Sequence, residues 1–360
     1  MDLKHILRDP RRRNIAVLAA LALLSLFLAV LALDQRAAET APKYPPQAFL
    51  PRFANKLTQV THIHIVSKKY GAFDVDFIPQ KGWVLPGSDN YPASFPEVRK
   101  TLVGLAALST IEPKTARADW YHYVDLVAPP KGDGVAITVS NDKGHVFADL
   151  IVGKSENIGD ASGAVGLFVR KPGDAQSWLV ASPFEPRANP ADWMEKDIVA
   201  VDRARIQEAD VHPANGPAYV LRRDKPSNPD FAIVDPPHGR ELSYPGAPDS
   251  VASAIADFSF DNIKPVDDLD FSDGASRIVT TTFDGLIVTV DVIQQGSDYW
   301  ARVYAGAQPG KTDAENEAHE INAHADRWAY KLSAYKGALF ATPLESLLKP
   351  RETAKKKVGK

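Results

Sequence analysis

His62 and His64 are the two residues of this chain whose type and spacing best fit metal chemistry. They alternate with apolar residues, and residues two apart on a strand point to the same side, where two imidazoles can bind Zn²⁺. Such a site needs a third ligand, for which three further histidines are candidates: His122, His145 and His212. The alternative is that both side chains are solvated on the polar face of a strand. We favour this alternative and predict no metal site.

Two acidic segments raise a similar question. Residues 267–274 hold four aspartates before Gly274, but this glycine comes one position too late for an EF-hand loop and no glutamate closes it. Residues 235–241 bring an acid, a histidine and an arginine together, yet two prolines and a glycine favour a polar turn. The chain also lacks a Gly-x-Ser-x-Gly motif and a His-Glu-x-x-His pair. We therefore predict no catalytic residue, no cofactor and no enzymatic activity.

Aromatic side chains are the remaining candidates for recognition. We expect Trp83, Trp120 and Trp300 to contact a ligand or a partner. Trp120 is followed by two tyrosines and a histidine within residues 121–123, and this cluster could stack on a sugar or a peptide. The alternative for the cluster is ordinary packing of a half-buried segment against a sheet.

Composition excludes several classes of function. The 360 residues carry a net charge of −3, so no general attraction to nucleic acid is expected. The absence of cysteine excludes disulfides and thiolate metal sites, and it is compatible with an oxidising compartment.

The N-terminal segment predicts a membrane anchor. An apolar run begins at Ile15, passes through Leu24 and ends at Leu33, and a helix of this length spans roughly 28 Å, close to the thickness of a bilayer. Basic residues, which keep their side of a span in the cytoplasm, precede the run: Arg11, Arg12 and Arg13. The alternative is a cleaved signal peptide, but the run is longer than the usual ~7–15 apolar residues and no clean cleavage site follows. We therefore predict an uncleaved single-pass anchor with a large extracytoplasmic domain.

The rest of the chain contains the same pattern twice. Tyr91-Pro92 and Tyr244-Pro245 each precede a helical run whose apolar residues are four and then three positions apart. Two strand-like segments follow in each copy, joined by Asn141–Gly144 in the first and by Asp284-Gly285 in the second. We therefore predict an α+β fold, in which an N-terminal transmembrane helix precedes two duplicated units, each an antiparallel sheet with one helix.

These patterns divide the chain into six parts. They are a basic cytoplasmic N-terminus (1–14), the transmembrane helix (15–33), a proline-containing linker (34–56), the first repeat unit (57–205), the second repeat unit (206–348) and a basic tail (349–360). The second unit departs from the first near its end, because residues 313–340 begin as a helix with acidic residues in its first turn.

Four short motifs occur along this pattern. They are Trp83-Val84, Tyr91-Pro92-Ala93, Leu150-Ile151-Val152-Gly153-Lys154 and Trp328-Ala329-Tyr330-Lys331-Leu332. Together with the N-terminal span they resemble the bacterial envelope family called "domain of unknown function 4340". The resemblance implies an auxiliary component of ABC-type transporters of the gliding-motility kind, and it supplies no catalytic residue.

We therefore expect a non-enzymatic accessory or adaptor protein of an ABC-type transport system, anchored in the bacterial inner (cytoplasmic) membrane with its C-terminal domain in the periplasm. Its expected partners are the bilayer, the transporter permease and associated envelope subunits. One alternative is a periplasmic glycan- or lipid-binding module, which should have a pocket lined by aromatic residues. A third is an envelope hydrolase that uses His62, His64 or residues 235–241. An adaptor should instead expose an apolar surface.

Overall fold

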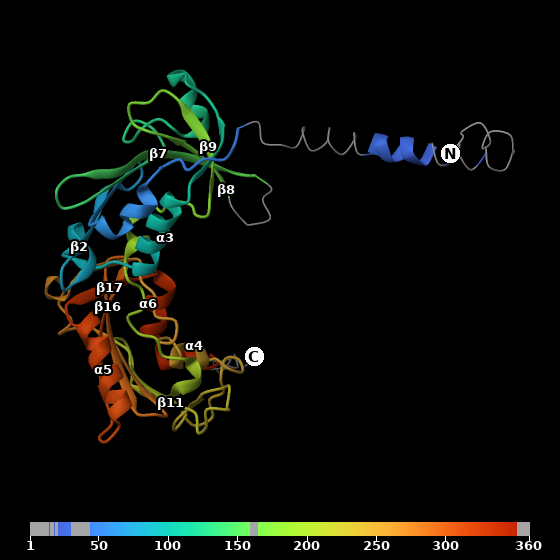
Figure 1. Ribbon diagram of the computed structural model, residues 1–360. Helices are drawn as coiled ribbons and strands as arrows, with labels where there is room; N and C mark the ends of the chain where they lie inside the picture. The colour runs from blue at the N-terminus through green and yellow to red at the C-terminus, as the bar shows by residue number, and fades with distance from the viewer. Residues whose placement is uncertain (1–13, 15–17, 19–20, 30–43, 159–164, 351–360) are drawn as a thin grey trace, which may run out of the picture. The chain divides into compact units, whose positions relative to one another are not determined.

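The computed structural model describes residues 14, 18, 21–29, 44–158 and 165–350, which form an α+β protein with two antiparallel sheets (Figure 1). The predicted combination of antiparallel sheets and helices is confirmed. The described residues fall into two compact units. Unit 1 draws on Met1–Thr58, Leu102–Ile137 and Phe147–Pro186, and unit 2 draws on Gln59–Thr101, Thr138–Val146 and Arg187–Lys360.

The spatial order of the strands differs from their order along the chain in both sheets. From one edge to the other, the first sheet consists of β4 (Tyr91–Pro92), β3 (Gly82–Leu85), β2 (Gly71–Ile78), β1 (His62–Ser67), β6 (Val135–Ser140), β7 (Val146–Asn157), β8 (Val165–Arg170), β9 (Ser177–Ser182) and β5 (Ser109–Pro113). The second consists of β12 (Ala232–Ile233), β11 (Tyr219–Arg222), β10 (Ile206–His212), β14 (Ser276–Thr282), β15 (Leu286–Gln295), β16 (Asp298–Ala307), β17 (Trp328–Leu332) and β13 (Asn262–Pro265).

The two sheets have the same strand order once the two-residue edge strand β4 is set aside. Numbered along the chain within each sheet, the strands lie in the order 3-2-1-5-6-7-8-4 in both cases. The two predicted turns lie where the sequence placed them, since Asn141–Gly144 joins β6 to β7 and Asp284-Gly285 joins β14 to β15. Each sheet therefore contains the same series of hairpins. In each, the fourth strand along the chain lies at the far edge, beside the eighth.

The helices lie between these strands. The α-helices are α3 (Phe95–Ala106), α4 (Asp249–Ala252), α5 (Thr312–Ala325), α6 (Ala334–Phe340) and α7 (Leu344–Leu347). The 3₁₀ helices are η1 (Phe53–Gln59), η2 (Pro86–Ser88), η3 (Ala118–Val124), η4 (Pro190–Trp193), η5 (Arg203–Arg205) and η6 (Val266–Asp268). In unit 2, α5 runs along β16 (Figure 1).

The repeated helix is regular only in its first copy. In α3 the predicted apolar face is buried, as is the equivalent face of Val251, Ile255 and Phe258. However, α4 ends at Ala252, and the chain continues in turns in which the amides of residues 254, 256 and 258 bond to carbonyls three positions earlier. These tighter bonds replace the α-helical ladder while keeping the same side chains in the core. The prediction was right about the buried face and wrong about the helix length.

The strand pair β1–β2 explains why polar residues gather on one side of the first sheet. Ile63, Ile65 and Val75 have no exposed surface, while the alternating polar residues His62, His64, Asp74 and Asp76 are half-buried. A strand with one face in the core alternates apolar and polar residues, and this pattern fixes its register because a one-residue slip would exchange the two faces.

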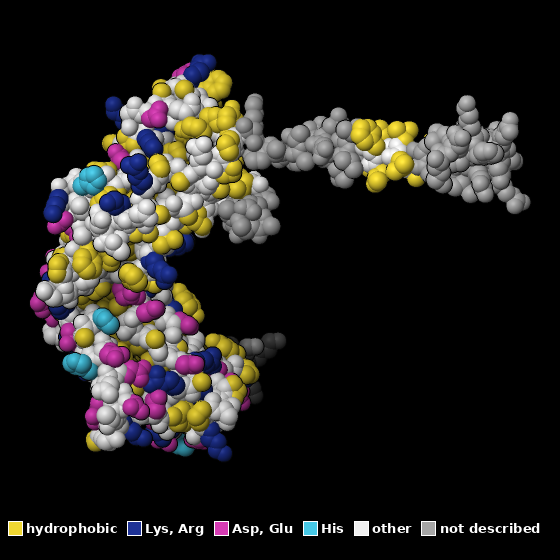
Figure 2. All heavy atoms as spheres, viewed as in Figure 1, with side chains coloured by type: hydrophobic (Ala, Val, Ile, Leu, Met, Phe, Trp, Pro, Cys, Tyr) yellow, Lys and Arg dark blue, Asp and Glu magenta, His cyan; other side chains and the backbone are white. Residues whose placement is uncertain are grey.

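The predicted membrane anchor lies largely outside the described residues, which include neither Ile15 nor Leu33, nor Arg11, Arg12 and Arg13. Residues 14, 18 and 21–29 are described and helical. In this part of the chain apolar side chains are uncovered (Figure 2), and Leu24, for example, is 53% exposed. No helix within the described residues is long and apolar enough to cross a membrane.

A buried arginine connects three backbone segments at the start of the second sheet. Arg223 follows β11 and is only 4% exposed. Its Nε donates to the carbonyl of Ile206 at 2.6 Å, one terminal nitrogen donates to the carbonyl of Asn228 at 3.0 Å, and the other donates to the carbonyl of Arg203. Burial lowers the pKa of the guanidinium from its ordinary value. The neighbouring Arg222 is half exposed and pairs with Glu208 across the two strands.

Substituting these two arginines separates the contribution of a buried arginine to the free energy of unfolding from that of an exposed one. Arg223→Met should lower the free energy of unfolding by about 2–4 kcal/mol, because three carbonyls lose their donor. Arg222→Met, the matched control, should lower it by less than ~1 kcal/mol, since exposed ion pairs contribute little. Urea unfolding followed by far-UV circular dichroism measures both values. Equal losses would contradict the structural role of Arg223.

Candidate functional site

A pocket forms where residues 44–51, which we call the strap, cross the edge of unit 1. Ala48 forms an isolated antiparallel bridge with Ser109 at the start of β5. The Gln47 amide donates to the Thr110 hydroxyl at 3.1 Å, and the Thr110 amide donates to the Gln47 carbonyl at 2.8 Å. The strap is therefore held to β5 by backbone and side-chain hydrogen bonds, and it forms one wall of the pocket.

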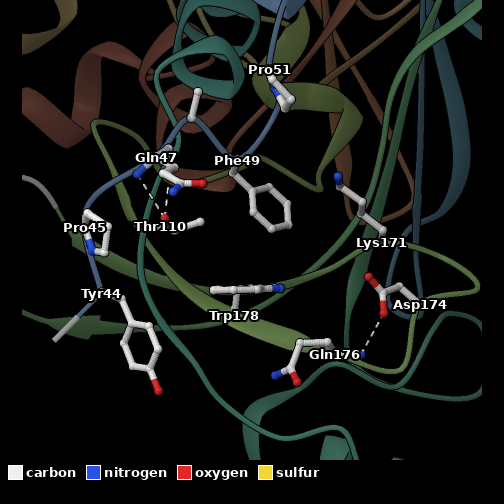
Figure 3. A pocket seen from close by; sticks show the side chains of 11 residues that line it. Tyr44, Pro45, Gln47, Phe49, Pro51, Thr110, Lys171, Asp174, Gln176 and Trp178 are labelled. Carbon is white, nitrogen blue, oxygen red and sulfur yellow. Dashed lines mark hydrogen bonds between the residues drawn. The ribbon is translucent and has the colours of Figure 1, made fainter.

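The pocket has a volume of about 380 Å³. Its lining consists of Tyr44, Pro45, Gln47, Ala48, Phe49 and Pro51 from the strap, and Thr110, Lys171, Asp174, Gln176 and Trp178 from β5 and the β8–β9 region. Figure 3 shows the indole of Trp178 lying across the middle of the pocket, with Phe49 on one side and Gln176 on the other. Tyr44 lies at one end, and Lys171 and Asp174 lie at the other.

The lining combines flat apolar rings with polar groups that have fixed positions. The Lys171 ammonium lies 5.2 Å from the centre of the Phe49 ring. The Asp174 carboxylate accepts a hydrogen bond from the Gln176 amide at 2.9 Å, which fixes the turn between β8 and β9. Aromatic faces beside a few oriented polar groups suit a ligand with an apolar C–H face and hydroxyl groups, such as a sugar ring.

The three tryptophans predicted to take part in recognition lie in different surroundings, and none of them lines this pocket. Trp83 is half-buried and packs edge-on against Phe77 with ring centres 5.7 Å apart. Trp120 is 49% exposed, whereas Trp300 is only 3% exposed and belongs to the core of unit 2. The pocket instead contains Trp178, which was not among the tryptophans predicted to take part in recognition.

An exposed aromatic surface lies on η3, in unit 1. Trp120 and Tyr123 are three residues apart, so their side chains emerge on the same side of a 3₁₀ helix, and they are 49% and 65% exposed. The Arg117 guanidinium covers the Trp120 ring at 4.9 Å, and the His122 ring lies 3.9 Å from that of Tyr123. A hydrogen bond from Arg117 holds the pKa of the Asp119 carboxyl below its usual value. We call Arg117, Trp120, His122 and Tyr123 the η3 surface.

The η3 surface is held in place by one of the four sequence motifs. A side chain on Gly153 of β7 would place its first carbon 2.0 Å from the carbonyl oxygen of Val124, so only glycine fits there. The adjacent Lys154 donates from Nζ to the carbonyl of Tyr123 at 3.0 Å. Beneath the surface, the buried Tyr121 donates its hydroxyl to the carbonyl of Ala175 at 2.5 Å. The η3 turn is therefore fixed from below while its aromatic rings face outward.

His62 and His64 lie side by side on β1 with nearly parallel rings, whose centres are 6.3 Å apart. Each faces an aspartate across the strand pair, because His62 is in register with Asp76 and His64 with Asp74. Among the described residues, His62, His64 and Asp74 are the group whose ligand atoms converge, all within 4.8 Å of one another. The third converging group is thus the Asp74 carboxylate, and His122, His145 and His212 are not part of the group.

The two acidic segments form structural turns. In residues 267–274, Asp270 accepts hydrogen bonds from the amide and the hydroxyl of Ser272, and these bonds lower the pKa of its carboxyl. In residues 235–241, Arg240 donates to Glu345 at 2.9 Å, and Glu241 pairs with Lys349, which lowers the pKa of Glu241. Arg240 and Glu241, two of the groups considered for acid–base chemistry, are therefore paired with the C-terminal segment.

The fold and these sites define an α+β protein with two antiparallel sheets, an aromatic pocket and an exposed aromatic turn. The chain belongs to the family described as "Domain of unknown function (DUF4340)", which it matches over residues 83–273. This confirms the family predicted from the four sequence motifs. The matched region includes both Gly153-Lys154 and η3. No match was found among curated proteins or among solved structures.

Gly153→Ala should disturb η3, because the added methyl group collides with a backbone oxygen that cannot move without the turn. We expect the free energy of unfolding to fall by about 1–3 kcal/mol, together with a changed emission spectrum of Trp120 in a variant that keeps this tryptophan alone. The matched control is Gly306→Ala in β16, where an added methyl group meets nothing within 4 Å. An unchanged Trp120 spectrum in Gly153→Ala would contradict the role of Gly153.

Proposed function

We propose that this protein is a non-enzymatic, membrane-tethered extracytoplasmic accessory or adaptor subunit of an ABC-type transport system, and that its η3 surface contacts a partner protein. The observation that carries the proposal is that Trp120 and Tyr123 are exposed on a turn whose inner side is held by contacts with β7. The link to a transporter rests on the family resemblance.

Several properties of the η3 surface support a protein-binding role. Large aromatic residues and arginine are enriched at the centres of protein interfaces. Trp120 and Tyr123 expose roughly half or more of their surface, although the core directly below them is well packed. Because Gly153 and Lys154 fix the turn in advance, binding would lose little conformational entropy.

The proposed tether rests on the N-terminal sequence and on the exposure of its described part. The apolar run from Ile15 to Leu33 has the length of a bilayer-spanning helix, and Arg11, Arg12 and Arg13 place its start in the cytoplasm. Large side chains of residues 21–29 are more than half exposed, which is unfavourable in water and favourable in lipid. We propose the inner membrane of a bacterium, with the C-terminal domain in the periplasm.

We also propose that the two sheets descend from one duplicated unit. The identical order of eight strands supports this proposal, because a shared order with a displaced fourth strand is a specific topology. The positions of the paired Tyr-Pro motifs along the chain support it as well.

Site-specific cross-linking tests the adaptor proposal. A photo-reactive phenylalanine at Tyr123, introduced in the native host, should capture the permease or its associated envelope subunits. The control position is Tyr335 on α6, which is 68% exposed and lies away from η3 in the chain. The double variant Trp120→Ala/Tyr123→Ala should reduce recovery of the permease at least about tenfold, since central aromatic residues dominate interface energies. Equal capture from both positions, or no transporter component from either, would contradict the proposal.

The pocket beside the strap favours a second candidate function, the binding of a periplasmic glycan. Its flat rings and oriented polar groups suit a sugar better than an acyl chain, because an acyl chain would leave the Asp174 and Lys171 charges facing apolar atoms.

Tryptophan fluorescence tests the glycan proposal. Oligosaccharides of β-1,4-linked N-acetylglucosamine should change the emission of the purified protein in a saturable manner. Trp178→Ala should weaken this binding about tenfold or more, because it removes the ring that lies across the pocket. Trp120→Ala is the control and should leave the affinity unchanged. Absence of saturable binding in the wild-type protein would count against a glycan of this type, and unchanged affinity in Trp178→Ala would count against this pocket.

A further inference from the structure

We propose that His62, His64 and Asp74 form a binding site for a divalent transition-metal ion, best matched by Zn²⁺. All three residues belong to unit 2 and lie on the β1–β2 pair. Their side chains are between 35% and 41% exposed, so an ion can reach them from solvent. The site is independent of the adaptor and glycan proposals.

The ligand atoms already have nearly the required spacing. Ligands bound to Zn²⁺ at ~2.0–2.1 Å in a tetrahedron lie roughly 3.3 Å from one another. His62 Nε2 lies 3.5 Å from Asp74 Oδ1, and His64 Nδ1 lies 2.6 Å from the same oxygen. An ion would replace the hydrogen bond between His64 and Asp74, and the three ligand atoms all lie within 4.8 Å of one another. Two nitrogens and one oxygen leave a coordination position open for water or for a donor from a partner.

Asp76 completes the arrangement. It bonds to Nδ1 of His62, which fixes the ring and leaves Nε2 as the atom that faces Asp74. Histidines that bind metals commonly use their second nitrogen to contact a carboxylate, which orients the ring and raises its basicity. The two histidines and two aspartates thus have different roles: three ligands and one orienting group.

The donor set indicates which ion would bind. Imidazole nitrogen with carboxylate oxygen suits Zn²⁺, Ni²⁺ and Cu²⁺, whereas Ca²⁺ and Mg²⁺ prefer oxygen alone. The alternative is an ordinary ladder of ion pairs on a sheet face. At the corresponding strand pair of the second sheet, Glu208 forms such an ion pair with Arg222, whereas Asp210 faces Val220. Arginine and valine cannot bind a metal, so only the first sheet has ligands on both strands at these positions.

Titration of the full-length protein with ZnCl₂ tests the proposal directly. The protein is purified in detergent without a polyhistidine tag, and binding is followed by calorimetry. The wild-type protein should bind one Zn²⁺ per chain at this site. His62→Gln and His64→Gln should each weaken binding at least about tenfold, and Asp76→Asn should weaken it by about 10–100-fold, the effect typical of orienting groups. His212→Gln is the matched control, because His212 also pairs with an aspartate on a strand, at 3.1 Å, and it should not change the affinity.

A second measurement requires no variant and is therefore insensitive to misfolding. X-ray absorption of the wild-type protein with one equivalent of Zn²⁺ should show two imidazole nitrogens and oxygen ligands in the first coordination shell. Lack of saturable binding, a spectrum with no imidazole, or full affinity in His62→Gln and His64→Gln would each overturn the proposal and leave the cluster as an ion-pair ladder.

Discussion

The register between antiparallel strands is the constraint on which the rest of this structure depends. In the β1–β2 pair, the backbone hydrogen bonds set His62 opposite Asp76 and His64 opposite Asp74, while the intervening isoleucines enter the core. Burial of those isoleucines fixes the register, because a slip of one residue would put the four polar groups inside and the isoleucines in water. The polar cluster is thus a by-product of how the core is filled, and the backbone positions of its four residues are set by that core.

The second sheet uses the same topology for a different purpose. Asp291 on β15 has no exposed surface, and it is bonded to Arg277 on β14 at 2.6 Å and to Arg302 on β16 at 2.8 Å. This carboxylate connects three neighbouring strands, and Arg223 connects the backbone at the start of the sheet. The paired charges of the second sheet therefore hold its strands together, whereas the first sheet carries the histidine cluster on its β1–β2 pair. One fold can carry either arrangement of charged side chains, because side chains on the outer face of a sheet can differ without changing the backbone hydrogen bonds between its strands.

Local patterns in the sequence predicted much of the fold, and distant contacts explain what they missed. Turn residues and alternation located the hairpins, and the spacing of apolar residues located α3 and the buried face after Tyr244-Pro245. Asp74 was missed as a ligand because its position opposite His64 depends on the register across a turn. The pocket was missed because the strap meets Thr110 about sixty residues away in the chain. Gly153 appeared in a motif, yet the carbonyl that requires a glycine there belongs to a distant turn.

The strap also has a mechanical consequence. It is both a wall of the aromatic pocket and the first described segment after the proposed tether, so the same eight residues would take part in the proposed recognition and in the proposed attachment. If the whole strap detached from unit 1, which would expose the buried Phe49 and Leu50, the chain between bilayer and domain would lengthen by at most roughly 26 Å, at ~3.3 Å per extended residue. A ligand resting against Tyr44 and Phe49 would oppose that detachment. Pocket occupancy would then limit how far from the membrane the domain can reach.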